Sequence, residues 1–212
     1  MIFATDPVEI EKRSFRIIAE KLTGRHFDPQ NANVIKRVIH TTADFDYVDN
    51  LVFSDHAVTA AKTVLKNGAR IVTDTQMAKA GINKKVLEQL GCSIHCFIDA
   101  PEVVKTARAA GTTRAQAAVD YAIETLENPI VFVVGNAPTA LIRLHELISS
   151  GTFTPVLIIA VPVGFVNVVE SKELILTLQV PHIVARGQKG GSNVAAAICN
   201  ALVYETSERT LT

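Results

Sequence analysis

The stretch Ile130-Val131-Phe132-Val133-Val134-Gly135-Asn136-Ala137-Pro138-Thr139 contains a continuous apolar run, a turn with glycine and asparagine, and a proline at the start of the following segment. A strand that is apolar at every position has both faces buried, which is typical of a parallel sheet covered by helices on both sides. Proline is favoured in the first turn of a helix, where its missing N–H would have no partner. The stretch therefore predicts a buried strand, a turn and a helix.

This strand-and-helix pattern occurs five times in the chain. The predicted strands cover residues 69–73, 93–98, 130–134, 156–161 and 182–185. The predicted helical segments that follow them cover residues 77–90, 101–126, 138–149, 172–178 and 192–206. Five such repeats predict an α/β fold with a doubly wound, five-stranded parallel sheet.

Helical patterns without an obvious strand fill the first part of the chain. Residues 7–22 have apolar side chains at helical spacing, and Asp28-Pro29 predicts the N-cap and first turn of a second helix. Ser54-Asp55 predicts the N-cap of a third helix. We therefore expect a helical N-terminal extension before the sheet.

The composition excludes several classes of protein. Lys and Arg number 21, and Asp and Glu also number 21, so the chain lacks the basic footprint of a nucleic-acid-binding protein. Its apolar runs are far shorter than the ~20 residues of a membrane-spanning helix, and the N-terminus lacks the features of a signal peptide. Three cysteines agree with a reducing compartment. With no linker or repeat to divide it, the chain is expected to form a single cytoplasmic domain over residues 1–212.

Two glycine-containing turns follow predicted strands, at the sheet edge where doubly wound proteins bind ligands. Neither residues 135–139 nor residues 187–192 match a dinucleotide fingerprint or a P-loop, so a standard nucleotide site is not expected. For residues 135–139, simple turn chemistry and anion binding both remain open. For residues 187–192, the neighbouring Arg186 and Lys189 favour anion binding, because helix N-termini attract negative charge.

The cysteines and histidines do not predict a metal site. On a strand, Cys92 and Cys96 would share one face while His95 points to the other. We expect Cys92, Cys96 and Cys199 to pack as small apolar residues.

Arg114 stands near the start of a predicted helix, where a positive charge opposes the helix dipole. This position favours an acidic or anionic partner, although a solvated arginine is the alternative. Further along the chain, Ser171 is predicted to be a helix N-cap.

His40 lies in a segment, residues 33–44, whose apolar residues form one stripe of a helix. His40, Arg37 and Asp44 fall on the opposite side. This arrangement is either that of an ordinary surface histidine or that of a titrating group presented to a ligand.

Eight short motifs occur along the chain in order. They are Arg13-Ser14-Phe15, Val38-Ile39-His40, Gly68-Ala69-Arg70-Ile71-Val72-Thr73-Asp74 with Met77, Thr113-Arg114, Gly135-Asn136-Ala137-Pro138-Thr139-Ala140-Leu141, Pro162-Val163-Gly164-Phe165-Val166, Glu170-Ser171-Lys172 and Gly190-Gly191-Ser192. Together they resemble the precorrin-8X methylmutase family, whose members on the cobalt-dependent route are called cobalt-precorrin-8 methylmutases. The resemblance covers nearly the whole chain, from about residue 7 to residue 202.

The resemblance implies an isomerase of cobalamin biosynthesis. Such an enzyme moves a methyl group from C-11 to C-12 of a corrin precursor by a 1,5-sigmatropic shift, giving hydrogenobyrinate or cobyrinate. It also implies a flavodoxin-like fold and a homodimer with active sites at the interface. No cofactor is expected, since any cobalt would belong to the substrate. The substrate is an apolar macrocycle rimmed by carboxylates.

The family's histidine falls on His40, and its substrate-contacting serine and arginines fall on Ser14, Arg37 and Arg114; the other expected site residues lie in or shortly after the turns that follow the predicted strands. We expect His40, protonated or sharing a proton, to donate to the macrocycle near the ring that carries C-11; general-acid help of this kind is typically worth ~10² to 10⁴ in rate. Asp44, one helical turn after His40, is a candidate group to orient the imidazole or hold its proton. The expected substrate-binding residues are Ser14, Arg37, Thr75, Gln76, Met77, Arg114, Asn136, Thr139, Gly164, Phe165, Lys172, Gly190, Gly191 and Ser192. The chain departs from the family pattern at Ala115 and Gln188.

Two other functions fit parts of the pattern. A tetrapyrrole carrier would bind the corrin without altering it. A flavin or nucleotide binder is suggested by the architecture, but the phosphate-binding motifs are missing.

Overall fold

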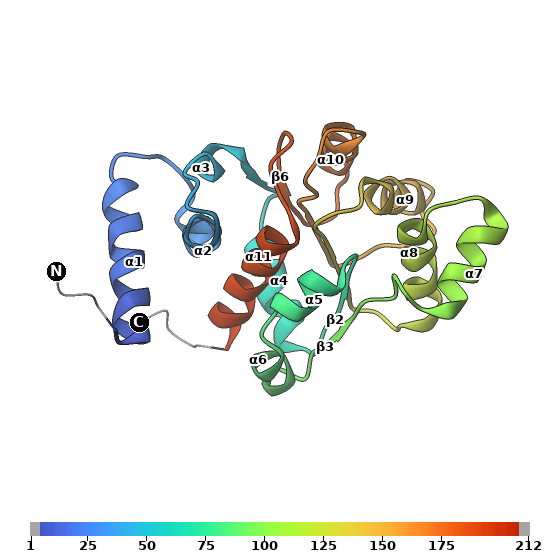
Figure 1. Ribbon diagram of the computed structural model, residues 1–212, viewed down its shortest axis with the longest axis horizontal. Coiled ribbons are helices and arrows are strands. Elements are labelled where there is room, and N and C mark those ends of the chain that lie inside the picture. The colour runs from blue at the N-terminus through green and yellow to red at the C-terminus, as the bar shows by residue number, and fades with distance from the viewer. Residues whose placement is uncertain (1–4, 208–212) are drawn as a thin grey trace.

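The computed structural model describes residues 5–207, and its centre is one mixed sheet of six strands (Figure 1). The strands are β1 (Leu51–Phe53), β2 (Arg70–Thr73), β3 (Ser93–His95), β4 (Ile130–Val134), β5 (Leu157–Ala160) and β6 (His182–Ala185). They lie in the order β1-β6-β5-β4-β2-β3. All neighbouring pairs are parallel except β1 and β6, which are antiparallel.

The prediction of a five-stranded, purely parallel sheet is therefore wrong, because it omits the antiparallel strand β1. The additional strand, β1, has only three residues and directly follows a helix, so no alternation of apolar and polar residues marks it. Its pairing is decided by distant β6, with Leu51 opposite Ala185.

Eleven α-helices surround the sheet within the described residues. They are α1 (Pro7–Lys21), α2 (Ala32–Thr42), α3 (Tyr47–Asn50), α4 (Ala57–Lys66), α5 (Gln76–Gly81), α6 (Lys84–Gln89), α7 (Pro101–Ala110), α8 (Arg114–Thr125), α9 (Pro138–Ser149), α10 (Val168–Leu176) and α11 (Ser192–Thr206). A short 3₁₀ turn, η1 (Pro29–Asn31), precedes α2. None of the helices in this part of the chain combines the length and apolarity of a membrane span.

The two faces of the sheet belong to two apolar cores. Alternate strand residues such as Val131 and Val133 pack with α2, α4 and α11, while Ile130 and Phe132 pack with α8 and α9 on the other face. This alternation follows from the period of two along a strand. Because β4 is buried at every position, it needs helices on both sides, as its sequence predicted.

Two predicted helices are each divided in two. The segment 77–90 breaks after α5, and the side chain of Asn83 caps α6 by accepting from Val86 N. The segment 101–126 breaks at Gly111, whose φ of 63° ends α7 in a left-handed conformation.

Two predicted N-caps are wrong. Ser171 lies inside α10, which begins earlier at Val168, and the Ser171 hydroxyl donates to Val168 O. Ser54 Oγ instead accepts from His182 N at 2.9 Å and so ties β1 to β6. Ser54, a short polar residue before an apolar run, thus makes a tertiary hydrogen bond and does not cap a helix. Asp28 does act as a cap, but of η1, which continues into α2.

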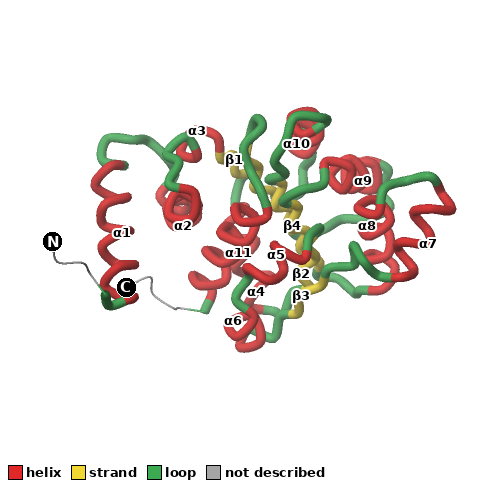
Figure 2. The backbone as a smooth tube through the Cα atoms, viewed as in Figure 1, coloured by secondary structure: helices red, strands yellow, loops and turns green. Residues whose placement is uncertain are grey.

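The N-terminal extension is confirmed as helical. Figure 2 shows α1 standing beside α2 at one end of the molecule, with α2 between α1 and α11. Ile18 and Leu22 of α1 reach the same apolar core as the stripe of α2.

Candidate active site

His40 lies near the C-terminal end of α2, on the side turned toward α1. The opposite stripe of α2, including Val34 and Val38, is fully buried, as its spacing predicted. His40 is half-buried rather than open to solvent, because Ser14 and Phe15 of α1 cover it. Ser14 Oγ lies 2.9 Å from His40 Nδ1, and the Phe15 ring stacks on the imidazole at a centroid distance of 4.8 Å.

The environment of His40 favours the neutral imidazole. Partial burial lowers the pKa of His40 below its usual 6.5, and the positive charge of Arg37 lowers it further, while Glu11 acts in the opposite direction. A neutral imidazole has one donor and one acceptor nitrogen. When Ser14 donates to Nδ1, the proton of His40 is on Nε2, and this N–H is then the group available to a ligand.

Arg37 is buried between α1 and α11, although the helix pattern placed it on the outer side of α2. Its Nη1 donates to Glu11 Oε1 at 2.8 Å. Its guanidinium lies over the rings of Phe15 and Tyr204, at 4.7 and 5.3 Å from the centroids. Its Nε and Nη2 are buried without a hydrogen-bond partner in the described structure. Such donors are costly to bury, so this arginine retains unused binding capacity.

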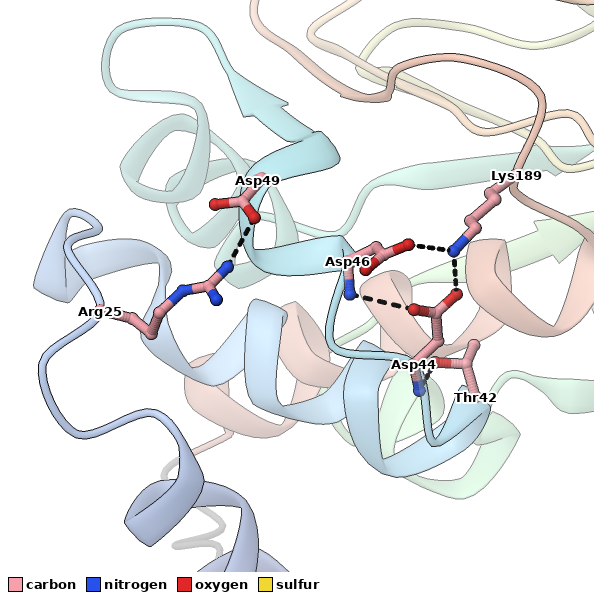
Figure 3. Close-up of polar contacts among 6 residues, drawn as sticks. All are labelled: Arg25, Thr42, Asp44, Asp46, Asp49 and Lys189. Atoms are coloured by element: carbon pink, nitrogen blue, oxygen red, sulfur yellow. Dashed lines mark hydrogen bonds and ion pairs between the residues drawn. The ribbon is translucent and has the colours of Figure 1, made fainter.

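Asp44 does not orient His40, and that expectation is wrong. Figure 3 shows the Asp44 carboxylate beside the ammonium of Lys189, with Oδ2 at 2.6 Å from Nζ. Asp46 Oδ2 lies at the same distance from Nζ. The hydrogen bond from Lys189 lowers the pKa of Asp44. The ring of His40 is instead positioned by Ser14 and Phe15.

A second group of expected site residues lies at the carboxyl ends of β2 and β4 and at the start of α11. Thr75 caps α5 by accepting from Ala78 N, and its Oγ1 lies 2.7 Å from Ser192 Oγ. Gly135 packs so closely that an added Cβ would lie 2.8 Å from Ser192 Cα. These contacts bring the loops after β2, β4 and β6 together.

The turn after β4 is held by a buried carboxylate that the sequence analysis did not single out. Asp74 accepts from the backbone N–H groups of Gly135, Asn136 and Ala137, at 2.9, 2.7 and 2.7 Å. Burial raises the pKa of Asp74, and the three N–H donors oppose this effect. The turn therefore binds the protein's own anion, which supports the turn-chemistry alternative. The sequence feature that could have identified Asp74 is its position as an acidic residue directly after a buried strand.

Lys172 has no exposed surface through which to contact a substrate directly. Its Nζ donates to Gly187 O at 2.7 Å and to Lys189 O at 2.8 Å. Burial lowers the pKa of Lys172 to about 8. We call residues 187–191 the glycine loop; Lys172 lies beneath it.

Arg114 has the acidic partner that its position favoured. Its Nη1 lies 3.1 Å from Asp99 Oδ1, and both side chains are more than half exposed. The preceding Thr113 caps α8 and its Oγ1 lies 2.8 Å from Thr139 Oγ1. Arg114 thus lies at the same edge of the sheet as Thr139. Arg186, after β6, is likewise paired, with Glu173 at 3.5 Å.

Large apolar side chains are exposed in the same loops. Met77, Val163, Phe165 and Val166 are 70, 49, 83 and 77% exposed, respectively. Met77 follows β2 and the other three follow β5. Exposed apolar residues beside polar groups are typical of a surface that binds a ligand or a partner. We call these four residues the exposed apolar set.

The cysteines are placed as expected for core residues in two of three cases. Cys92 is buried and its Sγ donates to Leu65 O, while Cys199 is buried with its pKa raised to about 12. Cys96 is half-buried, and His95 stacks on Phe97 at the edge of the sheet. No group of three His, Cys, Asp or Glu side chains suited to a metal occurs between residues 5 and 207.

The expected site residues thus form two groups in one chain. Ser14, Arg37 and His40 lie on α1 and α2, and the others lie on or under the strand-end loops. Lys189 connects the groups, because its side chain reaches the end of the His40 helix while its backbone belongs to the glycine loop.

The chain is similar in sequence and in structure to known proteins. Residues 9–205 match the family described as precorrin-8X methylmutase. A cobalt-precorrin-8 methylmutase of Salmonella typhimurium is 46% identical, over 98% of this chain and all of the relative. One of Leptospira interrogans is 40% identical, over 94% of each chain. The crystal structure of a precorrin-8X methyl mutase from Thermus thermophilus has a TM-score of 0.86 and 40% identity, covering 94% of this chain and 98% of that one.

Proposed function

Since the chain belongs to the precorrin-8X methylmutase family, the isomerases of cobalamin biosynthesis, we propose that it moves a methyl group from C-11 to C-12 of its corrin precursor. The observation that carries this proposal is the setting of His40. A half-buried imidazole with Ser14 on Nδ1 and Phe15 on its face is oriented as a catalytic group would be.

A methyl shift within one conjugated molecule consumes no second substrate. One carbon–carbon bond breaks at C-11, another forms at C-12, and the double bonds of the macrocycle rearrange. The protein's task is to bias the electron distribution of the ring. We propose that neutral His40 donates a hydrogen bond from its Nε2–H to the macrocycle near C-11, and a preorganised donor of this kind is typically worth ~10² to 10³ in rate.

Binding of the macrocycle follows from the strand-end loops. The exposed apolar set, in which Phe165 and Val166 are the most exposed, supplies a surface for the ring faces. Arg114, Thr139 and Ser192 can meet peripheral carboxylates, with Gln76, Asn136, Gly164 and the glycines of the glycine loop around them. The Arg114–Asp99 pair is no obstacle, because exposed ion pairs contribute only about 0–1 kcal/mol.

A homodimer would join the two groups of site residues. α1 leaves Val8, Ile10 and Ile17 largely exposed beside the Ser14 and His40 side of the molecule. We propose that a second copy covers this apolar surface and places its own strand-end loops against His40. Cross-linking through α1 and sedimentation of the free protein test this arrangement.

We further infer that the parallel part of the sheet is flavodoxin-like. When β2 to β6 are numbered from one to five, their order in the sheet is 2-1-3-4-5, and doubly wound flavodoxin-like sheets have this order. The enzyme would act in the cytoplasm without a protein-bound cofactor, and any cobalt would arrive with the substrate.

Turnover of purified corrin precursors tests the function. The metal-free and cobalt-containing precursors are incubated separately with catalytic amounts of protein, and the products are identified by absorbance and by the NMR position of the migrated methyl group. Because relatives at 46% and 40% identity are named cobalt-precorrin-8 methylmutases, we expect the cobalt form to be converted. A stoichiometric, reversible spectral shift without a new product would instead identify a tetrapyrrole carrier.

His40→Ala tests the assigned role. We expect substrate affinity within a few-fold of the parent and a loss of at least about 10² in kcat. A methyl shift at the parental rate in a folded, substrate-binding variant would remove His40 from the mechanism.

A further inference from the structure

Lys172 is the most unusual buried group in the described structure. Its ammonium is fully buried, forms no ion pair among residues 5–207, and is held by two neutral carbonyl groups. Desolvation is the cause of its lowered pKa. A charge buried without a counterion is costly, and an apolar residue of similar length would avoid this cost. The position therefore calls for a role that needs the ammonium.

The ammonium determines how the glycine loop is turned. Peptide units are planar and trans, so the N–H after a carbonyl points away from that carbonyl's partner. Because Gly187 O and Lys189 O point to Lys172, the N–H groups of Gln188 and Gly190 point away from it. Gln188 O accepts from Gly164 N, which turns the N–H of Lys189 away from Gly164 in the same manner.

The loop has little freedom to adopt another path. Gly191 N donates to Val161 O at 2.8 Å. Gly190 passes so close to the end of β5 that an added Cβ would lie 2.2 Å from Val161 O. Three successive N–H groups, of residues 188 to 190, donate to no backbone carbonyl in the described structure. The amides of Gln188 and Gly190 point the same way, away from Lys172, and neighbouring free amides with this arrangement are suited to an anion.

We propose that Lys172 is a positioning residue of the substrate site, holding the carbonyls of the glycine loop inward so that the amides of Gln188 and Gly190 receive a carboxylate of the macrocycle. This role rests on the proposed function and deepens it. Lys172 itself does not touch the substrate. Its loss weakens binding of the substrate and leaves the methyl-shift step intact.

Two substitutions separate positioning from plain structural support. Lys172→Met keeps an unbranched side chain, one atom shorter than Lys, and removes both hydrogen bonds of the ammonium, whereas Lys172→Gln has the same length as Met and restores an uncharged donor. We expect KM and the Kd for product to rise about tenfold in the Met variant, and less in the Gln variant, because hydrogen bonds to charged groups are worth more than neutral ones. We expect kcat within about twofold of the parent in both. Lys62→Met, at a partly exposed position of α4 that belongs to neither group of site residues, is the control and should leave KM unchanged.

NMR of the glycine amides measures the conformation of the glycine loop directly. Labelling with ¹⁵N-glycine gives signals from eleven residues, which include Gly164, Gly187, Gly190 and Gly191. In Lys172→Met we expect shifts concentrated at these four and little change at the other seven. Binding of product to the parent protein should shift the Gly190 signal, and binding to the Met variant should shift it less.

These measurements distinguish a failure of the positioning role of Lys172 from a failure of the proposed methyl-shift function. If the parent binds precursor without turnover, the methyl-shift function fails while the ratio of Kd values still measures the role of Lys172. If folded Lys172→Met binds product as tightly as the parent, or if kcat falls while KM is unchanged, the positioning role is overturned. A parent protein that binds no corrin precursor overturns both.

Discussion

The ammonium of Lys189 lies 2.6 Å from Oδ2 of Asp44, a residue 145 positions earlier in the chain. The pair joins the glycine loop to the end of the His40 helix, and Asp46 adds a second carboxylate (Figure 3). The backbone carbonyl of Lys189 is held by Lys172 at the same time. One residue thus connects the two groups of the proposed site.

Lys189→Met should raise the pKa of Asp44 toward its usual 3.8, because the hydrogen bond from Lys189 is the main cause that lowers it. NMR titration of the Asp44 carboxyl measures this shift. Arg25→Met is the matched control: it removes the nearby ion pair with Asp49 and should leave Asp44 unchanged. The backbone N–H of Asp46 also lowers the pKa of Asp44, so part of the shift should remain; an Asp44 pKa identical in the parent and in Lys189→Met would show that the pair does not form in solution.

Lys189→Met should also lower the affinity for substrate while the midpoint of thermal unfolding changes little, because exposed ion pairs contribute little to stability. A salt titration checks the electrostatic origin, since the difference between parent and variant should shrink as ionic strength rises.

His40 should titrate below pH 6.5, and Arg37→Met should raise its pKa, since the charge of Arg37 is the second cause of the lowering after burial. A histidine whose folded pKa lies below its unfolded value opposes folding once it is protonated. The free energy of unfolding should therefore fall as pH decreases from 6.5 through the folded pKa. NMR titration of the imidazole tests this, with the distant His95 as the reference. A His40 pKa above 6.5 would contradict the neutral-donor mechanism.

Lys172 should make stability rise with pH in an alkaline window. Its folded pKa of about 8 lies below the unfolded value of 10.5, so the unfolded chain binds more protons between these values. The free energy of unfolding should increase as pH rises from about 8 to 10.5. Urea unfolding at pH 7.5 and pH 10 should show a larger gain for the parent than for Lys172→Met. Equal pH dependence in the two proteins would refute burial of the charged form.

Asp74→Asn should destabilise the protein by roughly 3 kcal/mol, because the three N–H groups of the turn after β4 then meet a partly donating amide within a buried site. Denaturant unfolding measures the loss. Asp28→Asn is the control: it caps η1 on the surface and should cost much less. A neutral effect of Asp74→Asn would show that the turn keeps its conformation without this carboxylate.

Much of the fold follows from local pattern. The apolar run of β4 needed burial on both faces, and the stripe of α2 containing Val34 and Val38 needed a core to pack against. β1 could not be predicted in this way, because three residues carry no usable period and their pairing with β6 depends on a segment over a hundred positions away. The exposed position of Arg114 and its acidic partner were also within reach of helix-dipole reasoning.

Local sequence is sufficient to predict the alternation of strands and helices, the order of the motifs and, through them, the family. The tertiary structure alone decided what the charged side chains do. Arg37 is covered by α1, Lys172 turns inward to two carbonyls, and Asp44 pairs with Lys189 rather than His40. The period of a helix or strand determines only which face of that element a residue occupies. Which element covers that face is settled only when segments far apart in the chain pack together.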